Sequence, residues 1–247
     1  MIRVVVSSVL AAVFASAVAG AQTVPCSQPS ACADLKVDPN TMTKSWRVAT
    51  STFSATNCAV VEGEVVAGTR KLLRFTTTYP NIGTAALVVG APSVHPEWFE
   101  YSPCHKHYHF KDYTDYRLWT AQGYSQWVAL RAANPSTVLS RDLLLQNPSI
   151  AAQMLHGDKR GFCVIDVKYY GPKVTGKPPT PVYADCLNNQ GISVNWADEY
   201  NYTLSGQWID ITGAPSGTYT LEVEVNAEHL FTELDYSNNS AAIQVQF

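Results

Sequence analysis

The sequence has little charge and few long apolar runs. Only 15% of its 247 residues are Asp, Glu, Lys or Arg, and the formal net charge is −3. This near balance predicts no nucleic acid as a partner, because domains that bind nucleic acids carry clustered basic residues. Beyond residue 21, no stretch approaches the roughly 20 apolar residues that a membrane-spanning helix needs. We therefore expect no membrane span in the rest of the chain.

The first 21 residues have the pattern of a secretory signal peptide. Arg3 precedes an apolar run over residues 4–18, and small residues follow at 19–21. Cleavage at this point predicts a secreted, extracellular protein. Residues 22–45 are rich in Pro, Ser, Asp and Thr and are expected to form an N-terminal arm. Residues 46–247 are then long enough for one large domain with a substantial core.

Six cysteines follow the predicted signal, and an even number in an exported chain predicts disulfide bonds. They are Cys26, Cys32, Cys58, Cys104, Cys163 and Cys186. Six cysteines allow 15 pairings, and only a short Cys26–Cys32 loop is suggested by proximity in the sequence. Asn201 in Asn-Tyr-Thr and Asn238 in Asn-Asn-Ser fit the N-glycosylation pattern, which matters if the source is a eukaryote.

Short runs of β-branched and aromatic residues, separated by turn-forming residues, predict an all-β, sandwich-like domain with long loops. The expected strands are residues 60–66, 71–79, 85–89, 105–109, 113–120, 125–130, 159–168, 208–211, 218–225 and 241–247. Between residues 135 and 156, leucines and other apolar residues at wider spacing predict a short helical insertion on the surface. Proline and glycine over residues 171–181 predict a long loop.

Three of the six histidines stand at alternate positions of one segment, at His105, His107 and His109. Alternate residues of an extended strand share one face, whereas in a helix the same spacing would scatter them. A straight strand would hold the outer two Cα atoms about 13 Å apart, which is wide for ligands of one ion. The segment is therefore expected to bend, so that the three imidazoles converge.

Three imidazoles on one face predict a metal site, since packing rarely requires such a set. Nitrogen ligands without an adjacent carboxylate favour copper or zinc, and three protein ligands leave a coordination position open for water or substrate. The histidines alone support the two metals about equally. A zinc hydrolase is disfavoured because no glutamate stands near them in a recognised arrangement to serve as base.

The histidine segment resembles the copper-binding signature of the lysyl oxidase family, Cys-His-x-His-Tyr-His. Three further blocks are similar to family segments in the same order, so that the resemblance covers roughly residues 35–247. They are Gly157-Asp158-Lys159-Arg160-Gly161-Phe162-Cys163, Tyr200 eight residues before Trp208, and Asp235-Tyr236-Ser237-Asn238-Asn239.

The resemblance implies a copper amine oxidase that makes its own cofactor. Copper at the three histidines is expected to promote oxidation of Tyr200, whose ring then joins the amine of Lys159 to give lysine tyrosylquinone. The implied reaction converts extracellular protein lysines or small primary amines to aldehydes, with molecular oxygen consumed and peroxide and ammonia released. Asp112, three residues after His109, is the candidate catalytic base.

The chain departs from the animal family pattern in several places. Tyr101 stands where animal members have a further histidine, and the helical insertion has no counterpart. The resemblance implies a Cys104–Cys186 bridge, and it leaves Cys58 and Cys163 as single members of family pairs, which we expect to join each other. A non-catalytic extracellular metal-binding β-sandwich module is the alternative function.

Overall fold

The computed structural model describes residues 24–28, 30–171 and 177–247, so the predicted signal peptide lies outside the described residues. The strands are β1 (Arg47–Phe53), β2 (Gly68–Arg74), β3 (Thr77–Pro80), β4 (Leu87–Gly90), β5 (Phe99–Ser102), β6 (His107–Phe110), β7 (Thr114–Trp119), β8 (Met154–His156), β9 (Lys168–Tyr169), β10 (Gln190–Ile192), β11 (Trp196–Tyr200), β12 (Trp208–Asp210), β13 (Thr218–Val225) and β14 (Ser240–Gln246). The helices are α1 (Pro39–Ser45), α2 (Cys58–Val61), the 3₁₀ helix η1 (Pro96–Trp98), α3 (Ala121–Ala132), α4 (Ser140–Gln146) and α5 (Pro148–Ala151). Within the described ranges, no helix is both long and apolar enough to cross a membrane.

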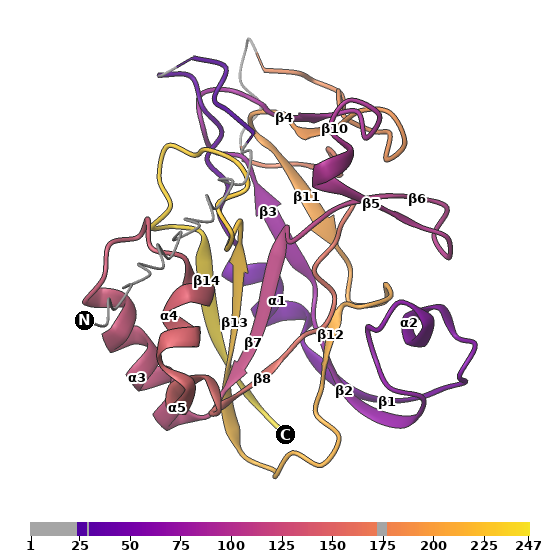
Figure 1. The fold of residues 1–247 in the computed structure, drawn as a ribbon, viewed down its shortest axis with the longest axis vertical. Helices are drawn as coiled ribbons and strands as arrows, with labels where there is room; N and C mark the ends of the chain where they lie inside the picture. The colour runs from indigo at the N-terminus through magenta and orange to yellow at the C-terminus, as the bar shows by residue number, and fades with distance from the viewer. Residues whose placement is uncertain (1–23, 29, 172–176) are drawn as a thin grey trace, which may run out of the picture.

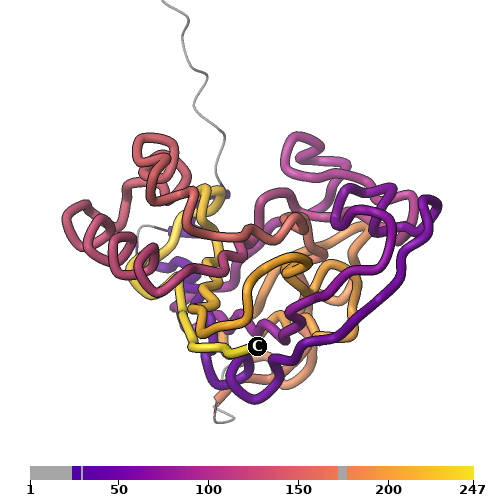
Figure 2. Tube along the Cα trace, turned by 90° about the horizontal axis from the view of Figure 1, so that it is seen from below, coloured from indigo at the N-terminus to yellow at the C-terminus, as the bar shows by residue number. Residues whose placement is uncertain are grey.

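The described strands form several small antiparallel sheets around a shared core, which confirms the predicted all-β, sandwich-like class (Figure 1). The sheet orders are β1-β2-β12, β3-β11-β9, β14-β13-β7-β8, β10-β4 and β5-β6. The β5–β6 hairpin lies at the edge of the molecule, on the side opposite helices α3–α5 (Figures 1 and 2). The histidine segment is thus held on a hairpin rather than in a central sheet.

Strand β13 explains why helices cover one face of the largest sheet. Its apolar residues at alternate positions enter the main core, while Glu222 and Glu224 face the other side and lie beside the fully buried Arg117. Trp127 of α3 stacks on Trp119 and donates its indole N–H to Glu222 at 2.9 Å. Because buried charges need hydrogen-bond partners, the helices are needed to cover and satisfy the charged face of this sheet.

Four predicted strands differ from the structure. The expected strand over residues 71–79 is divided between β2 and β3, which belong to different sheets. Residues 125–130 belong to helix α3, which begins after Thr120, whose hydroxyl caps it by accepting from the Gly123 N–H at 3.0 Å. Residues 60–66 span the end of the short helix α2 and the turn after it. Over residues 159–168, only Lys168 lies in a strand. The rest of this segment lies beside other strands but does not form the continuous series of backbone hydrogen bonds that defines a strand.

The predicted N-terminal arm packs into the domain. Leu35, Val37 and Met42 are buried in the main core, and Ala33 and Leu35 form bridges with Glu233 and Asn81. The predicted boundary at residue 46 therefore does not separate a free arm from the domain. The segment is polar in composition, but its apolar residues at alternate positions are buried in the main core.

The three disulfides correct the predicted pairing. Cys26–Cys32 is confirmed, whereas the expected Cys104–Cys186 and Cys58–Cys163 bridges are wrong. The structure instead joins Cys58 to Cys104 and Cys163 to Cys186, with Cα–Cα separations of 5.7 and 5.4 Å. Cys58 begins helix α2, which packs against the turn that carries Cys104, since Glu62 of this region accepts a hydrogen bond from Ser102.

The second corrected bridge follows from the position of Gln190. Its side chain accepts from the Val164 N–H at 2.9 Å and donates to the Cys186 carbonyl at 3.0 Å. This brings Cys186 next to Cys163, which precedes Val164 in the chain. Sequence spacing alone carried no sign of this contact.

Candidate active site

The histidine segment bends as the sequence predicts. His107 and His109 lie in β6, whereas His105 lies in the preceding turn. Lys106 adopts a left-handed conformation with φ of 59°, and its N–H donates to the Ser102 carbonyl at 2.8 Å. This single reversal turns His105 back toward the other two rings, which a straight strand could not do.

The three imidazoles converge on one point. The ring nitrogens of His107 and His109 are 3.1 Å apart, and those of His105 and His109 are 3.4 Å apart. Ligands about 2.0–2.1 Å from a tetrahedral ion stand about 3.3 Å from each other, so these separations fit a copper or zinc ion. Glu62 lies 3.8 Å from the His105 Nε2, where it can orient that ring.

Burial keeps two of these rings in the neutral form that metals bind. Burial, with the nearby positive charge of Lys159, lowers the pKa of His109 to about 3. Burial also lowers the pKa of His107. At neutral pH, both rings therefore offer a free nitrogen lone pair without first losing a proton.

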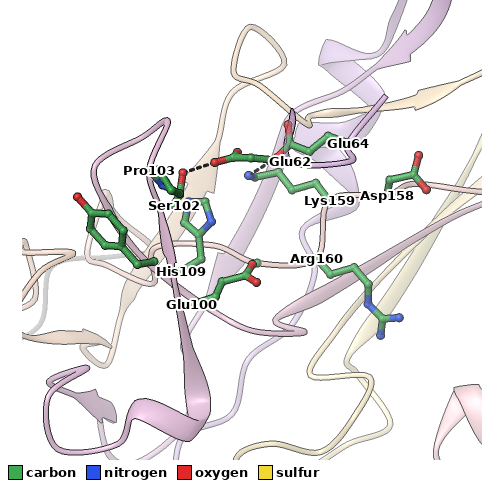
Figure 3. A pocket seen from close by; sticks show the side chains of 11 residues that line it. Glu62, Glu64, Glu100, Ser102, Pro103, His109, Asp158, Lys159 and Arg160 are labelled. Atoms are coloured by element: carbon green, nitrogen blue, oxygen red, sulfur yellow. Dashed lines mark hydrogen bonds and ion pairs between the residues drawn. The ribbon is translucent and has the colours of Figure 1, made fainter. Parts of the chain in front are cut away.

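The segment that carries Lys159 is held beside β6 by backbone hydrogen bonds. The Phe110 N–H donates to the Phe162 carbonyl at 2.7 Å, and the Phe162 N–H donates back at 3.1 Å. Further along, the Tyr113 N–H donates to the Arg160 carbonyl at 2.9 Å. These contacts run the lysine segment antiparallel to β6. Figure 3 shows the Lys159 and Arg160 side chains leaving this segment in opposite directions.

Lys159 is buried, with 8% of its surface exposed, and its charge is paired. Its Nζ lies 2.6 Å from the Oε1 of Glu64, which is also buried, as Figure 3 shows. Its methylene groups lie against Gly206, whose φ is 72°. A solvated surface lysine would show neither feature, so the structure sets Lys159 apart from most lysines of the chain.

Tyr200 ends strand β11, pairs with Thr77 of β3 and packs against the main core. Its hydroxyl donates to the Cys163 carbonyl and lies 2.8 Å from the Oδ2 of Asp198. Burial, with the negative charge of Asp198, raises the pKa of Tyr200 well above that of an exposed tyrosine. Burial likewise raises the pKa of Asp198. The phenol is held in one orientation as a neutral donor.

One cavity brings together every residue predicted to form the metal site and the cofactor. Its wall contains the three histidines, Lys159 and Tyr200, together with Phe162, Cys163, Ile165, Val167, Cys186, Asp198, Glu199, Leu204 and Ser205. A second, more acidic cavity meets it at His109 and Lys159, and includes Glu62, Glu64, Glu100 and Asp158 (Figure 3). The residues that line the first cavity come from four separate segments of the chain, which are 105–109, 159–167, residue 186 and 198–205.

The structure does not bring Asp112 to this cavity. Its carboxylate lies 2.9 Å from the Arg160 Nε, and its side chain is 44% exposed. Of the two predicted glycosylation sites, Asn201 is exposed, whereas Asn238 is half-buried and donates to Asp34 at 2.8 Å.

Sequence reasoning missed two residues that contact Lys159 and Tyr200. Asp198 stands two positions before Tyr200 on one strand, and this alternate spacing was a signal that could have identified it. Glu64 lies far from Lys159 in the sequence, in the turn after α2, and no motif pointed to it.

The fold and the site together define an antiparallel β domain in which three histidines that could hold a metal ion share a cavity with a buried lysine and a tyrosine. The sequence model of the lysyl oxidase family matches residues 34–130 and 138–247, and the chain belongs to this family. Between the two matched ranges, residues 131–137 include the last two residues of α3 and most of the loop that leads to α4.

Several animal proteins are similar to this chain. Protein-lysine 6-oxidase of Sus scrofa is 30% identical over 180 residues, which cover 72% of this chain and 57% of that protein. The protein-lysine 6-oxidase of Gallus gallus is 30% identical over 183 residues, or 72% of this chain and 34% of that protein. Lysyl oxidase homolog 1 of Homo sapiens is 28% identical over 225 residues, or 87% and 33%. The chain thus spans between a third and somewhat over half of the length of these relatives.

Proposed function

We propose that the chain is a secreted copper amine oxidase, which oxidises peptidyl lysine or other primary amines with a lysine tyrosylquinone made from Lys159 and Tyr200. The observation that carries the proposal is that both residues line the same cavity as His105, His107 and His109. The non-catalytic alternative gives no reason for a buried lysine at this place. Three disulfides and the predicted signal peptide are in keeping with export.

The metal proposed for the three histidines is copper, because a one-electron redox metal suits oxidation of a phenol, which zinc cannot promote. Two molecules of dioxygen balance cofactor formation. One atom of the first would become a new oxygen on the Tyr200 ring, and the other would leave as water with two hydrogens from the tyrosine. The second takes the two electrons and two protons released once the Lys159 nitrogen has bonded to the ring, and leaves as hydrogen peroxide.

In turnover, the quinone supplies the electron acceptor for the substrate amine. A primary amine, dioxygen and water give an aldehyde, ammonia and hydrogen peroxide, which balances in atoms and electrons. Asp198 and Glu199 are the carboxylates that line the cavity, so we expect the base that removes the substrate Cα proton from this pair instead of Asp112. Phe162, Ile165 and Leu204 give the cavity apolar walls, which limit water near the reacting groups.

The proposal is tested by peptide mapping of the secreted chain after copper loading in air. A peptide that joins Lys159 to Tyr200, together with aldehyde and peroxide formation from a lysine-containing peptide, is the expected result. Lys159→Arg and Tyr200→Phe should abolish both the joined peptide and turnover, since they remove the nucleophilic amine and the phenol. Lys44→Arg and Tyr202→Phe are the matched controls, because Lys44 and Tyr202 do not line the cavity.

Two outcomes would overturn the proposal. Turnover in the Lys159→Arg variant at the wild-type rate would exclude the cofactor. Metal binding in the wild-type chain without a joined peptide or turnover would favour the non-catalytic metal-binding module.

A further inference from the structure

The buried charge beside Lys159 has a consequence for how that lysine reacts. An ammonium group has no lone pair, so Lys159 has to lose a proton before its nitrogen can bond to the Tyr200 ring. In the structure, the Lys159 Nζ lies 2.6 Å from the Glu64 Oε1. Both groups are at least nine-tenths buried, with 8% and 5% of their surfaces exposed.

Glu64 is itself held firmly. Its second oxygen accepts from the Ser205 hydroxyl at 2.9 Å, and its backbone N–H donates to the Ala59 carbonyl at 2.7 Å. The indole of Trp208 donates to its carbonyl at 3.4 Å. The preceding helix α2 is joined through Cys58 to Cys104, next to the first histidine. Glu64 is therefore fixed to the same framework as the metal site.

We propose that Glu64 is the counter-ion and proton acceptor of Lys159, holding its amine in the cavity before the cofactor forms and taking its proton when the nitrogen bonds to the ring. The transfer converts an ammonium and a carboxylate into a neutral amine and a carboxylic acid, with no proton taken from or given to solvent. This inference rests on the proposed function, and it assigns to Glu64 a part in making the cofactor.

The neighbouring carboxylates explain why a specific partner is needed. Glu62, Glu100 and Asp158 line the adjoining cavity, within the region that Lys159 borders. Without Glu64, the lysine ammonium would be drawn toward these groups and away from Tyr200. We therefore expect both the position and the reactivity of the amine to depend on Glu64.

The first test uses the metal-free chain and does not depend on cofactor formation. An amine-selective acylating reagent is applied to the wild type, Glu64→Gln and Glu64→Asp, and modification of Lys159 is measured by mass spectrometry of peptides. We expect Glu64→Gln to raise the rate of modification at least about tenfold, because a carboxylate this close favours the charged form of the amine, which the reagent does not attack. Glu64→Asp keeps the charge and should lie nearer the wild type. Equal rates in the wild type and Glu64→Gln would overturn the inference.

The second test follows formation of the Lys159–Tyr200 joined peptide after copper addition in air, as a function of pH. Internal transfer to Glu64 exchanges no proton with solvent, whereas in Glu64→Gln the proton has to leave to solvent. Because the amine of the variant is no longer held in position for Tyr200, its rate relative to the wild type should be low, and this ratio should rise with pH by up to about tenfold per unit. Steps shared by both proteins cancel in this ratio. A ratio of one at every pH would overturn the role of Glu64.

The matched control is Glu233→Gln. Glu233 is another buried carboxylate, with 6% of its surface exposed, and it lines neither of the two cavities that Lys159 borders. This variant should leave acylation of Lys159 and formation of the joined peptide unchanged. Absence of a joined peptide in the wild type would reject the proposed function, while the acylation experiment would still decide whether Glu64 holds Lys159.

Discussion

Gly206 is the residue against which the side chain of Lys159 is packed. An added Cβ would lie 2.7 Å from the Lys159 Cβ and would also overlap its Cδ. The positive φ of Gly206 is a second reason for glycine, because other residues adopt it at a cost of about 1–2 kcal/mol. This glycine therefore permits both the local turn and the close approach of the lysine.

Gly206→Ala should lower the yield of the joined Lys159–Tyr200 peptide severalfold, because the methyl group displaces the lysine stem. Gly213→Ala is a matched control, since Gly213 has φ of 82° and nothing within 4 Å of its added Cβ. Both variants should lose about 1–2 kcal/mol in the free energy of unfolding from backbone strain. Equal peptide yields in the two variants would show that contact with Lys159 is unimportant.

At the residue scale, the sequence predicted the histidines, Lys159 and Tyr200 that line the cavity better than the residues that contact them. The histidines are recognisable by spacing, and Lys159 and Tyr200 by resemblance to family segments. Glu64 was not predictable, because its role depends on a contact between segments almost a hundred residues apart in the chain. Asp112 was misjudged because proximity in sequence to His109 does not place a side chain on the same side of the hairpin.

At the scale of elements, the β5–β6 hairpin depends on helix α2 for its attachment. The Cys58–Cys104 disulfide joins residues 46 positions apart and fixes the turn that carries His105. The register of β6 against β5, with His109 opposite Glu100, then sets the other two rings.

Replacing both Cys58 and Cys104 by serine should lower the free energy of unfolding by about 2–4 kcal/mol and weaken copper binding. The paired replacement of Cys26 and Cys32 is the control, because that bridge spans six positions and lies away from the histidines. Urea titration and metal titration of both variants provide the measurements. An equal loss of copper affinity in the two variants would contradict the role assigned to the longer bridge.

Glu233 connects the N-terminal segment to the loops around β13 and β14. It accepts hydrogen bonds from the Leu35 N–H at 2.6 Å and from the side-chain amides of Asn226 and Asn239. Burial, opposed by these donors, raises the pKa of Glu233 from 4.5 to about 8. The folded chain therefore retains a proton that the unfolded chain releases.

From pH about 4.5 toward 8, this group should lower the free energy of unfolding as pH rises, by at most about 1.4 kcal/mol per unit. Below that window its contribution to stability is fully present. Glu233→Gln does not titrate and should reduce the slope. Thermal unfolding across this pH range is the measurement, and an identical slope in wild type and variant would contradict the assignment.

The sequence predicted elements well where local pattern and burial agree. Strand β13 has the predicted bounds, because its alternating residues match a sheet whose second face is also covered. Residues 125–130 were misassigned, since Trp127 and Val128 favour strands locally. In the structure, the cap at Thr120 and the stacking of Trp127 on Trp119 favour the helix. Tertiary contacts of this kind are not visible in a local pattern.

At the scale of the whole molecule, metal binding should stabilise the folded chain, since the converging histidines exist only in the folded state. A metal at 100 times its dissociation constant adds about 2.7 kcal/mol. Copper or zinc should therefore raise the melting temperature of the wild type. His109→Ala should lose this response, whereas His95→Ala should keep it, because His95 stacks on Trp98 outside the cavity. A response retained in His109→Ala would place the metal elsewhere.

The Cys163–Cys186 disulfide has a consequence for the order in which the chain matures. It spans 23 positions, more than half of the chain between Lys159 and Tyr200, so the loop that their union would close is already shortened. Loop-closure entropy depends on the length that remains free, and the later bond therefore adds less stability than the sequence separation suggests. Formation of this disulfide during folding would thus bring Lys159 and Tyr200 much closer along the chain before they join. In a chain whose cysteines stay reduced, the Lys159–Tyr200 bond would form slowly even with copper and oxygen in excess.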